Sequence, residues 1–354
     1  MIAIVNTEFV LWGIWGSFLL VAIGFTFGIL REKKKTRRKN LTLSFEAPAQ
    51  VTPVSLARHE EVIRAFLRPS LVQELASGSD PLRFRPEIRN LAILFCDIRD
   101  FTRITEILNP YEKLAFLNQY FTMMTKPILD HGGEVDKIMG DCVMAVFPDG
   151  RQAVLAALDM RRELEKFNAG FIGSDQPLIR NGFGIAKGEV VLGNFGSNQK
   201  LDRTVIGEAV NIAARLESKT KMYSLDIVVT EDVIQDLGPD FPHCRWIDNA
   251  SVKGSSRRLK LYEVYGYQNE ETVAYKDGTR FMLEKALTIY FNKGFPDASR
   301  LFKAMKEQLT TFSGEMNDGL LEYYIGHCDA WLQNPKVTLE FLEKWEGVHV
   351  FHEK

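Results

Sequence analysis

The chain of 354 residues is long enough for one sizeable domain with extensions. Its 44 Lys and Arg residues nearly balance 46 Asp and Glu residues, and a formal net charge of -2 argues against a nucleic-acid binder that relies on bulk positive charge. Four scattered cysteines and six histidines form no metal-ligand spacing, which argues against a zinc site or a disulfide framework and is typical of a reducing compartment.

An apolar stretch lies near the start of the chain. Residues 9–30 are 22 positions without a charge, enough to span a bilayer core of about 30 Å. A cleaved signal peptide is the alternative, but the residues before this stretch contain no Lys or Arg. Residues 31–39 then carry seven basic residues, which could bind nucleic acid but after a hydrophobic span are typical of a cytoplasmic anchor. The pattern predicts one membrane helix with the N-terminus outside and the rest of the chain in the cytoplasm.

The next residues lead into the main domain. Residues 41–53 are polar, contain two prolines and are typical of a linker. Residues 54–77 have helical spacing in two pieces separated at Pro69, which predicts a helical lead-in.

A predicted buried strand ends on a carboxylate. Residues 91–96, L-A-I-L-F-C, are continuously apolar, as in a strand buried on both faces, and Asp97 follows directly. A carboxylate there is costly unless a cation or donors meet it, although Asp is also a preferred helix N-cap. Within residues 134–147, Gly140-Asp141 separates two apolar runs and predicts a two-residue hairpin. In one sheet its tip can lie beside Asp97, and two converging carboxylates favour a divalent cation such as Mg²⁺.

Helices and strands alternate through the rest of this domain. Helices are predicted from Asn109-Pro110 to about residue 130 and over residues 151–167. Residues 181–195 carry four glycines among β-branched residues, which predicts two strands with a turn between them. The order predicts an α/β sandwich with helices on one face of a largely antiparallel sheet.

Residues 204–217, T-V-I-G-E-A-V-N-I-A-A-R-L-E, place Asn211 and Arg215 on one face of a predicted helix. With F-C-D-I-R-D-F-T, K-I-M-G-D and G-E-V-V-L-G-N-F-G-S, this stretch resembles the class III adenylyl/guanylyl cyclases in motif order and spacing. Asp97 and Asp141 are 44 residues apart, as the two metal aspartates of that family typically are. The resemblance covers roughly residues 66–266 and implies a ferredoxin-like βαββαβ core.

The resemblance implies roles for residues that bind metal and phosphate. Asp97, Asp141 and the backbone of Ile98 are expected to hold two Mg²⁺ or Mn²⁺ ions per site. The triphosphate is expected to lie on the following turn and helix start and on a later lysine: Ile98, Phe101, Thr102 and Lys253. Lys253 is equally well explained as a surface lysine. Asp100 stands where the family commonly has glycine.

The resemblance also implies residues for the ribose, the transferred phosphoryl group and the base. Asn211 is expected to orient the ribose, and Arg215 to stabilise charge on the phosphoryl group. Lys137 is expected to donate to N1 of adenine, and the hydroxyl of Thr204 to accept from the 6-amino group. In the family these four residues and the metal aspartates come from different subunits, which implies a homodimer with two shared sites.

Three further positions, Arg203, Lys187 and Glu208, depart from the family pattern, and a tail follows the resemblance. Arg203 and Lys187 add positive charge that could tune nucleotide affinity.

Helical spacing over residues 279–291 and 297–312, and again after residue 320, resembles the tetratricopeptide-like tails of some bacterial cyclases. Two repeats are too few for a free-standing solenoid, so the tail is expected to pack on this chain or on a protein partner.

These features divide the chain into four parts: the N-terminal membrane segment 1–30, the basic linker and helical lead-in 31–84, the catalytic domain 85–267 and the helical tail 268–354. The leading hypothesis is a single-pass adenylate cyclase of the cell (inner) membrane that converts ATP to cyclic AMP and pyrophosphate. The alternatives are a guanylate cyclase, which Lys137 disfavours, and a catalytically inactive membrane scaffold. The intact metal, ribose and phosphoryl residues argue against the scaffold.

Overall fold

The computed structural model describes residues 67–106, 108–170, 178–197, 199–252, 258–311, 316–333, 345 and 347–351. The predicted membrane segment, the basic run, the linker and the first piece of the helical lead-in lie outside these residues, as does Lys253. Within the described ranges, no helix is both long and apolar enough to cross a membrane.

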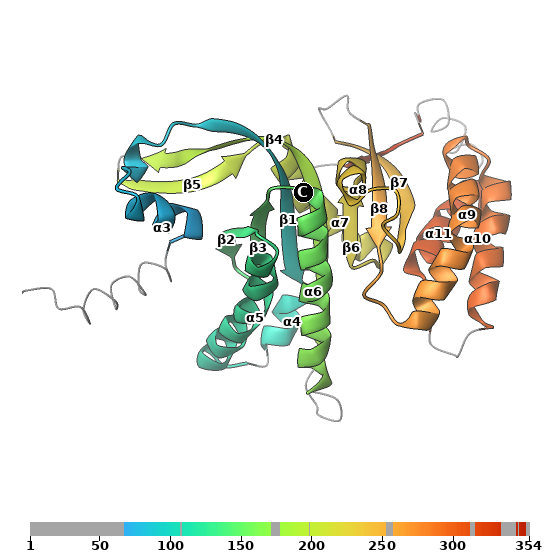
Figure 1. Ribbon diagram of the computed structural model, residues 1–354. Helices are drawn as coiled ribbons and strands as arrows, with labels where there is room; N and C mark the ends of the chain where they lie inside the picture. The colour runs from blue at the N-terminus through green and yellow to red at the C-terminus, as the bar shows by residue number, and fades with distance from the viewer. Residues whose placement is uncertain are drawn as a thin grey trace, which may run out of the picture. The chain divides into compact units, whose positions relative to one another are not determined.

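The main domain is built around one twisted sheet (Figure 1). Its first elements are α3 (Pro69–Ala76), the 3-10 helix η1 (Pro81–Arg83), β1 (Glu87–Ile98), α4 (Phe101–Glu106), α5 (Pro110–Asp130), β2 (Glu134–Met139), β3 (Cys142–Phe147), α6 (Gly150–Ala169), β4 (Asn181–Ser197) and β5 (Lys200–Ile206). The later elements are α7 (Glu208–Tyr223), β6 (Ile227–Thr230), α8 (Glu231–Leu237), β7 (Cys244–Val252), β8 (Arg258–Val264), α9 (Glu270–Phe291), α10 (Phe295–Leu309), α11 (Gly319–Gln333) and β9 (His349–Phe351).

The strand order in the described residues is β2-β3-β1-β4-β6-β8-β7-β9, with β5 paired to β4 beside this path. Within the group β2-β3-β1-β4, each pair of adjacent strands is antiparallel, and α5 and α6 connect these strands in the predicted βαββαβ order. Beyond them β6 runs parallel to β4, so the sheet is mixed. The ferredoxin-like arrangement places the end of β1 in the middle of the sheet, next to the β2–β3 turn.

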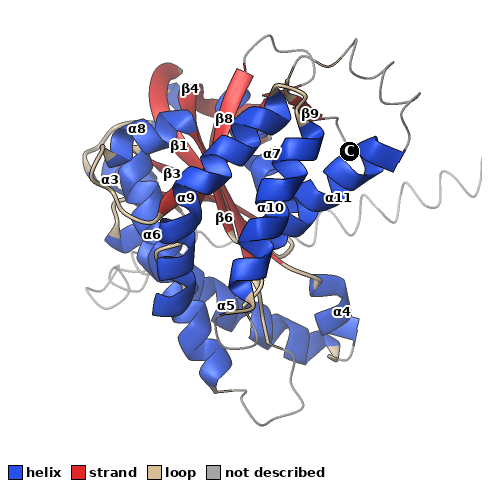
Figure 2. Ribbon diagram, turned by 90° about the vertical axis from the view of Figure 1, so that its right-hand side faces the viewer, coloured by secondary structure: helices blue, strands red, loops and turns tan. Residues whose placement is uncertain are grey.

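Side chains of β1 alternate between two hydrophobic cores. Ile93 and Phe95 belong to the core under α7 and the tail, whereas Ala92, Leu94 and Cys96 belong to the core under α5 and α6. The strand is therefore buried on both faces, as its continuous apolar run predicts. The prediction that helices cover only one face is wrong, because each apolar face of such a strand requires its own cover. Figure 2 shows the tail helices α9, α10 and α11 on the side of the sheet that faces the viewer.

Strand β4 is unbroken from Asn181 to Ser197, so the turn predicted within residues 181–195 is absent. Gly184 instead allows a helix to pack closely against the strand. A Cβ atom there would lie 2.2 Å from the carbonyl oxygen of Ala213 and from the amide nitrogen of Glu217, both in α7. The glycine thus lets α7 lie directly on the strand, which is the other common reason for glycine inside a strand.

Helix α5 begins where the sequence predicts it. The side chain of Asn109 accepts hydrogen bonds from the amides of Tyr111 and Glu112 at 2.9 and 3.0 Å, and Glu112 accepts one from the amide of Asn109 at 2.9 Å. Such a capping box satisfies amides at the helix start and contributes on the order of 1 kcal/mol. The helix ends at Asp130 and delivers the chain into the β2–β3 hairpin.

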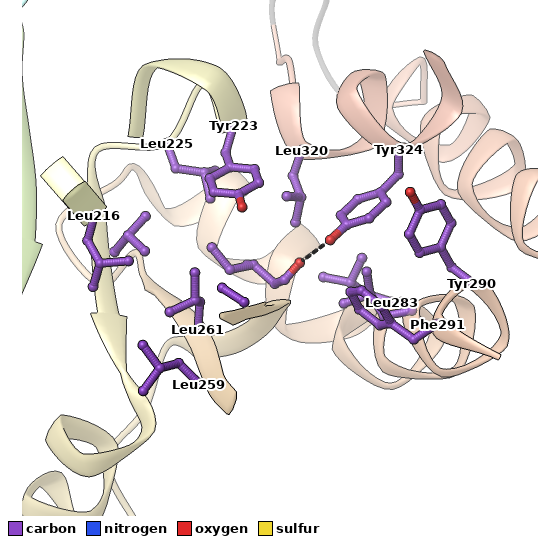
Figure 3. Close-up of a cluster of buried hydrophobic side chains, with 14 of the residues drawn as sticks. Leu216, Tyr223, Leu225, Leu259, Leu261, Leu283, Tyr290, Phe291, Leu320 and Tyr324 are labelled. Carbon is purple, nitrogen blue, oxygen red and sulfur yellow. Dashed lines mark hydrogen bonds between the residues drawn. The ribbon is translucent and has the colours of Figure 1, made fainter. Parts of the chain in front are cut away.

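The helical tail packs on the sheet of its own chain. Strand β9 pairs in parallel with β7. Arg245 of β7 donates to both carboxylate oxygens of Asp318 at 2.6 and 2.8 Å, and the hydroxyl of Tyr324 donates to the carbonyl of Ile247 at 2.7 Å. Figure 3 shows the apolar side chains that α7, the sheet and the tail share: Leu216, Tyr223, Leu225, Leu259, Leu261, Leu283, Tyr290, Phe291, Leu320 and Tyr324. The neighbour that the sequence requires for the tail is therefore the catalytic domain.

Candidate active site

The two predicted metal aspartates meet at one end of the sheet. Asp97 is the next-to-last residue of β1, and Asp141 lies in the turn between β2 and β3. Gly140 before it has a φ of 67°, the left-handed conformation that a tight hairpin needs. Because β3 pairs antiparallel with β1, this turn lies beside the end of β1. Both carboxylates line one cavity of about 800 Å³, together with three predicted phosphate-binding residues: Ile98, Phe101 and Thr102.

The cavity is strongly negative around Asp97. Burial, and after it the charges of Asp141 and Glu217, raise the pKa of Asp97 from 3.8 to about 7. Its Oδ1 atom is buried and has no hydrogen-bond partner among the described residues. An unsatisfied carboxylate oxygen beside a second carboxylate fits a hard divalent cation such as Mg²⁺ or Mn²⁺.

Asp97 and Asp141 are the two predicted metal ligands in this cavity. Within the described ranges, no group of three His, Cys, Asp or Glu side chains is placed to hold a metal. Two carboxylates alone are typical of Mg²⁺ sites in which substrate phosphates complete the coordination. The chemistry of the donor set therefore fits an ion that binds together with a polyphosphate.

The turn after β1 contains a left-handed residue. Asp100 has a φ of 54°, a conformation that favours glycine and that Asp tolerates better than most residues. Its exposed carboxylate accepts a hydrogen bond from the ammonium group of Lys221 in α7 at 2.6 Å. The departure from the family pattern at Asp100 thus keeps the turn geometry and adds a link to α7. Helix α4, which follows, has six residues, so its dipole adds little.

A buried charge cluster lies behind this turn. Asp226 lies 3.1 Å from Arg161 and 3.2 Å from Arg99, and it accepts a hydrogen bond from the hydroxyl of Tyr267 at 2.9 Å. Burial alone would raise the pKa of Asp226, but Arg161 and Arg99 lower it below its usual value. The amide of Arg99 also donates to the carbonyl of Arg180 at 2.8 Å. These contacts fix the start of the turn, and no local sequence pattern indicates them.

The predicted base-reading residues lie on two other strands. Lys137 of β2 forms an ion pair with Asp202 of β5 at 2.9 Å. Thr204 of β5 is buried, and its hydroxyl donates to the carboxylate of Asp136 at 2.7 Å. Each of the two residues predicted to contact the base is therefore held by a carboxylate of this chain. No sequence pattern marks Asp136 or Asp202 as a partner, although each lies within two positions of Lys137 or Thr204.

Helix α7 carries the other two predicted residues. Asn211 is exposed and Arg215 is half-buried one turn later. The helix starts after Gly207, where a Cβ atom would lie 2.8 Å from the carbonyl oxygen of Glu189 in β4. Gly207 at the start of α7 and Gly184 in the strand beneath it therefore set the distance of α7 from the sheet.

The structure does not gather all predicted residues around Asp97. Lys137, Thr204, Asn211 and Arg215 are not among the residues that line the cavity of Asp97. These four residues lie on β2, β5 and α7.

The two extra positive charges, Arg203 and Lys187, both have partners within the chain. Arg203 forms an ion pair with Glu74 of α3, donates to the carbonyl of Pro81 at 2.9 Å and lies over the ring of Phe84. Lys187 forms an ion pair with Asp236 at 2.6 Å. Each charge therefore has an acidic partner within the chain, and an effect on nucleotide affinity stays a prediction.

Comparison with known proteins agrees with this geometry. A family model described as the adenylate and guanylate cyclase catalytic domain matches residues 85–267. The chain is 42% identical over 186 residues to an adenylate cyclase of Anabaena cylindrica, a match that covers 50% of this chain and 37% of that protein. It is 31% identical over 292 residues to the terminal-differentiation-specific adenylate cyclase of Dictyostelium discoideum, a match that covers 79% of this chain and 13% of that protein.

Among solved structures, a bacterial light-regulated adenylyl cyclase superposes with a TM-score of 0.55 at 29% identity. The superposition covers 62% of this chain and 66% of that one. The chain spans well under half the length of the curated relatives named here.

Proposed function

The chain belongs to the adenylate and guanylate cyclase catalytic-domain family, and on that basis we propose that it is an adenylate cyclase that converts ATP to 3′,5′-cyclic AMP and pyrophosphate. The observation that carries the proposal is the meeting of Asp97 and Asp141 in one cavity. The buried Asp97 oxygen, which has no partner in the described part of the chain, adds to it. The names of the relatives from Anabaena and Dictyostelium support adenylate over guanylate.

The metal-binding residues fit two Mg²⁺ or Mn²⁺ ions. Asp97 and Asp141, with the backbone carbonyl of Ile98, would hold them. When bound, such ions lower the pKa of a bound hydroxyl and neutralise charge on phosphate oxygens. The turn that starts at Arg99 and the side chains of Phe101 and Thr102 line the same cavity and would receive the triphosphate.

The residues on α7 complete the proposed reaction. The 3′-oxygen of the ribose attacks the α-phosphorus, and pyrophosphate leaves. Asn211 orients the ribose by hydrogen bonding, and Arg215 stabilises the negative charge that develops on the transferred phosphoryl group. Arg215 suits this role because a guanidinium group can donate two parallel hydrogen bonds to phosphate oxygens.

The choice of base rests on Lys137 and Thr204. The ammonium group of Lys137 donates to N1 of adenine, which is an acceptor, whereas N1 of guanine carries a proton. The hydroxyl of Thr204 accepts from the 6-amino group of adenine. A site built for one hydrogen-bond pattern leaves buried groups unpaired with the other base, so we propose ATP as the substrate.

We further propose a homodimer with two shared sites and a membrane anchor. The dimer is proposed because, in the family, the metal aspartates and the other four predicted residues come from different subunits, and this chain carries one copy of each. The uncharged stretch 9–30 and the basic run 31–39 support a single-pass protein of the inner membrane, with the N-terminus outside and the catalytic domain cytoplasmic. The packing of the consecutive helices α9 and α10 supports the tetratricopeptide likeness of the tail, for which we propose a protein partner.

The proposal is tested by turnover of the purified full-length chain with ATP and with GTP, each with Mg²⁺ or Mn²⁺, and with chromatographic separation of the products. Cyclic AMP from ATP is the expected product, and Asp97→Ala abolishes it. A matched control is Asp240→Ala, which removes an exposed carboxylate from a turn and leaves activity unchanged.

Two other outcomes would contradict the proposal. Preferential formation of cyclic GMP would identify a guanylate cyclase. Absence of any cyclic product from a dimeric preparation would favour the inactive membrane scaffold.

A further inference from the structure

Asp136 is a buried carboxylate with two partners from distant parts of the chain. Its side chain is fully inaccessible to solvent. One oxygen accepts a hydrogen bond from the hydroxyl of Thr204 at 2.7 Å, and the other forms an ion pair with Arg68, immediately before α3. Arg68 also donates to the backbone carbonyl of Asp136 at 3.3 Å. Both carboxylate oxygens therefore have a donor.

A β-bulge explains how Asp136 reaches Thr204. In the pairing of β2 with β3, Val135 lies opposite Ala145 and Lys137 opposite Met144, so Asp136 is an extra residue without a partner. A bulge changes the alternation of side chains, so that consecutive residues can point to the same side of the strand. Asp136 and Lys137 accordingly contact Thr204 and Asp202, two positions apart on one face of β5.

The contact fixes the direction of the Thr204 hydroxyl. A threonine hydroxyl has one proton and two lone pairs, and a carboxylate paired with arginine can only accept hydrogen bonds. The proton of Thr204 therefore points to Asp136, and its lone pairs remain for other partners. In this state Thr204 can accept a hydrogen bond from a ligand but cannot donate one.

This constraint separates the two purine bases. The 6-amino group of adenine is a donor and matches an accepting hydroxyl, whereas the 6-oxygen of guanine is an acceptor and does not. We infer that Asp136 is a specificity-determining positioning residue, which selects a purine with a 6-amino group by locking Thr204 as an acceptor. The inference rests on the proposed function, and it adds a residue that does not itself contact the base.

Arg68 gives the inference a sharp test. An arginine has no acceptor, so in Asp136→Asn the amide oxygen must face Arg68 and the amide NH₂ group must face Thr204. The substituted side chain then donates to Thr204, whose hydroxyl proton becomes free to donate to a ligand. The variant thus reverses the hydrogen-bond character of Thr204 with almost no change in shape.

The experiment compares kcat/KM of the full-length protein for three substrates: ATP, GTP and purine ribonucleoside triphosphate, which keeps the N1 acceptor and lacks the 6-amino group. For Asp136→Asn we expect the ATP-to-GTP ratio to fall about tenfold or more. We expect the value for the analogue to change by less than about threefold, because it makes no hydrogen bond to Thr204.

A second variant and a double variant keep the test decisive if Asp136→Asn folds poorly. Thr204→Val leaves the ion pair of Asp136 with Arg68 in place, and it should lower kcat/KM for ATP but not for the analogue. In Thr204→Val, the further change Asp136→Asn should leave the ATP-to-GTP ratio as it is. The matched control is Asp248→Asn, which alters another buried carboxylate that accepts from a hydroxyl, that of Tyr223, and should leave the ratio unchanged.

The outcomes separate this inference from the proposed function. Equal losses with ATP and the analogue, in Asp136→Asn or in Thr204→Val, would show a merely structural role and overturn the inference. An unchanged ATP-to-GTP ratio in both variants of an active enzyme would do the same. A wild-type protein that forms no cyclic AMP would overturn the proposed function, and the inference with it.

Discussion

The two ends of the candidate site differ in how their charges are balanced. At the metal end, Asp97 lies beside Asp141 and Glu217, and these like charges raise its pKa to about 7. At the base-reading end, Lys137 faces Asp202, and Thr204 faces Asp136. The metal end is thus electrostatically incomplete in the protein alone, whereas the base-reading end is already satisfied.

The difference indicates which part of the site a ligand completes. Two adjacent carboxylates repel each other and destabilise the fold until a cation binds, and the binding free energy of the cation then includes relief of that repulsion. Residues held in place before binding lose little entropy when the base arrives. Metal binding is therefore expected to change the stability of the protein, and base recognition is expected to depend on preset geometry.

Loss of a metal ligand should have the largest effect. We expect Asp141→Asn to lower kcat by about 1,000-fold or more, because the amide cannot replace a charged ligand of a catalytic ion. Steady-state kinetics with a titration of Mg²⁺ measures this. The matched control Asp130→Asn removes an exposed carboxylate that pairs with Lys126 and should leave kcat within about twofold. Near-normal kcat in Asp141→Asn would contradict the role of the hairpin carboxylate.

Displacement of α7 from the sheet should destabilise the fold. A Cβ atom at Gly184 would overlap backbone atoms of α7, so Gly184→Ala should lower the free energy of unfolding by about 3 kcal/mol. Urea denaturation measures this. Gly278 in α9 has no atom within 4 Å of such a Cβ, and Gly278→Ala should instead stabilise the protein by about 0.5–1 kcal/mol. Equal responses of the two variants would show that Gly184 does not set the position of α7.

The pH dependence of stability should come from the metal end. The pKa of Asp97 is raised from 3.8 to about 7 in the folded protein, so the folded state binds the proton more tightly than the unfolded state. In EDTA, stability should therefore decrease as the pH rises through this range. Thermal unfolding at several pH values measures the change, and Asp97→Asn should remove much of it.

The raised pKa of Asp97 also predicts how Mg²⁺ changes the melting temperature at different pH values. Because the ion binds the ionised carboxylate, Mg²⁺ should raise the melting temperature by several degrees at pH 8 and by less at pH 6. Asp97→Asn should also melt higher than the wild type at pH 8 in EDTA, although it is inactive. A Mg²⁺ effect that does not depend on pH would contradict the electrostatic account of Asp97.

Loss of an exposed ion pair at the base-reading end should have the smallest effect. Lys137 and Asp202 are partly exposed, with side-chain exposures of 32% and 53%. Asp202→Asn should therefore change the free energy of unfolding by less than about 1 kcal/mol. Chemical denaturation measures this, and a larger loss would show that the pair is not merely a positioning contact.

The metal end was predictable because its signals are local. Asp97 follows an apolar strand directly, and Gly140-Asp141 separates two apolar runs, so each carboxylate is marked by its own neighbours in sequence. The pairing of β1 with β3 then brings the two together, as the predicted sheet requires. The boundaries of α5 were predictable for the same reason, since its cap lies within residues 109–112.

The parts of the fold and of the candidate site that were not predicted depend on contacts between residues distant in sequence. Asp226 gathers Arg99 and Arg161, and Asp136 joins Arg68 to Thr204, but nothing next to either aspartate marks these partners. The glycines of β4 were misread because a glycine in a strand indicates either a turn or a close approach, and only the position of α7 decides between them. Similarly, helices cover both faces of the sheet because α7 and the tail pack on the face opposite to α5 and α6, and the sequence does not show on which face a later helix packs.

The most direct test of the central claim mixes two inactive variants, Asp97→Ala and Arg215→Ala. If two chains share each site, a mixed dimer has one site with both an intact Asp97 and an intact Arg215. Random exchange of equimolar subunits should then restore about a quarter of the wild-type rate of cyclic AMP formation. No recovery, when cross-linking shows that mixed dimers have formed, would contradict the shared site and place all the catalytic residues in one chain.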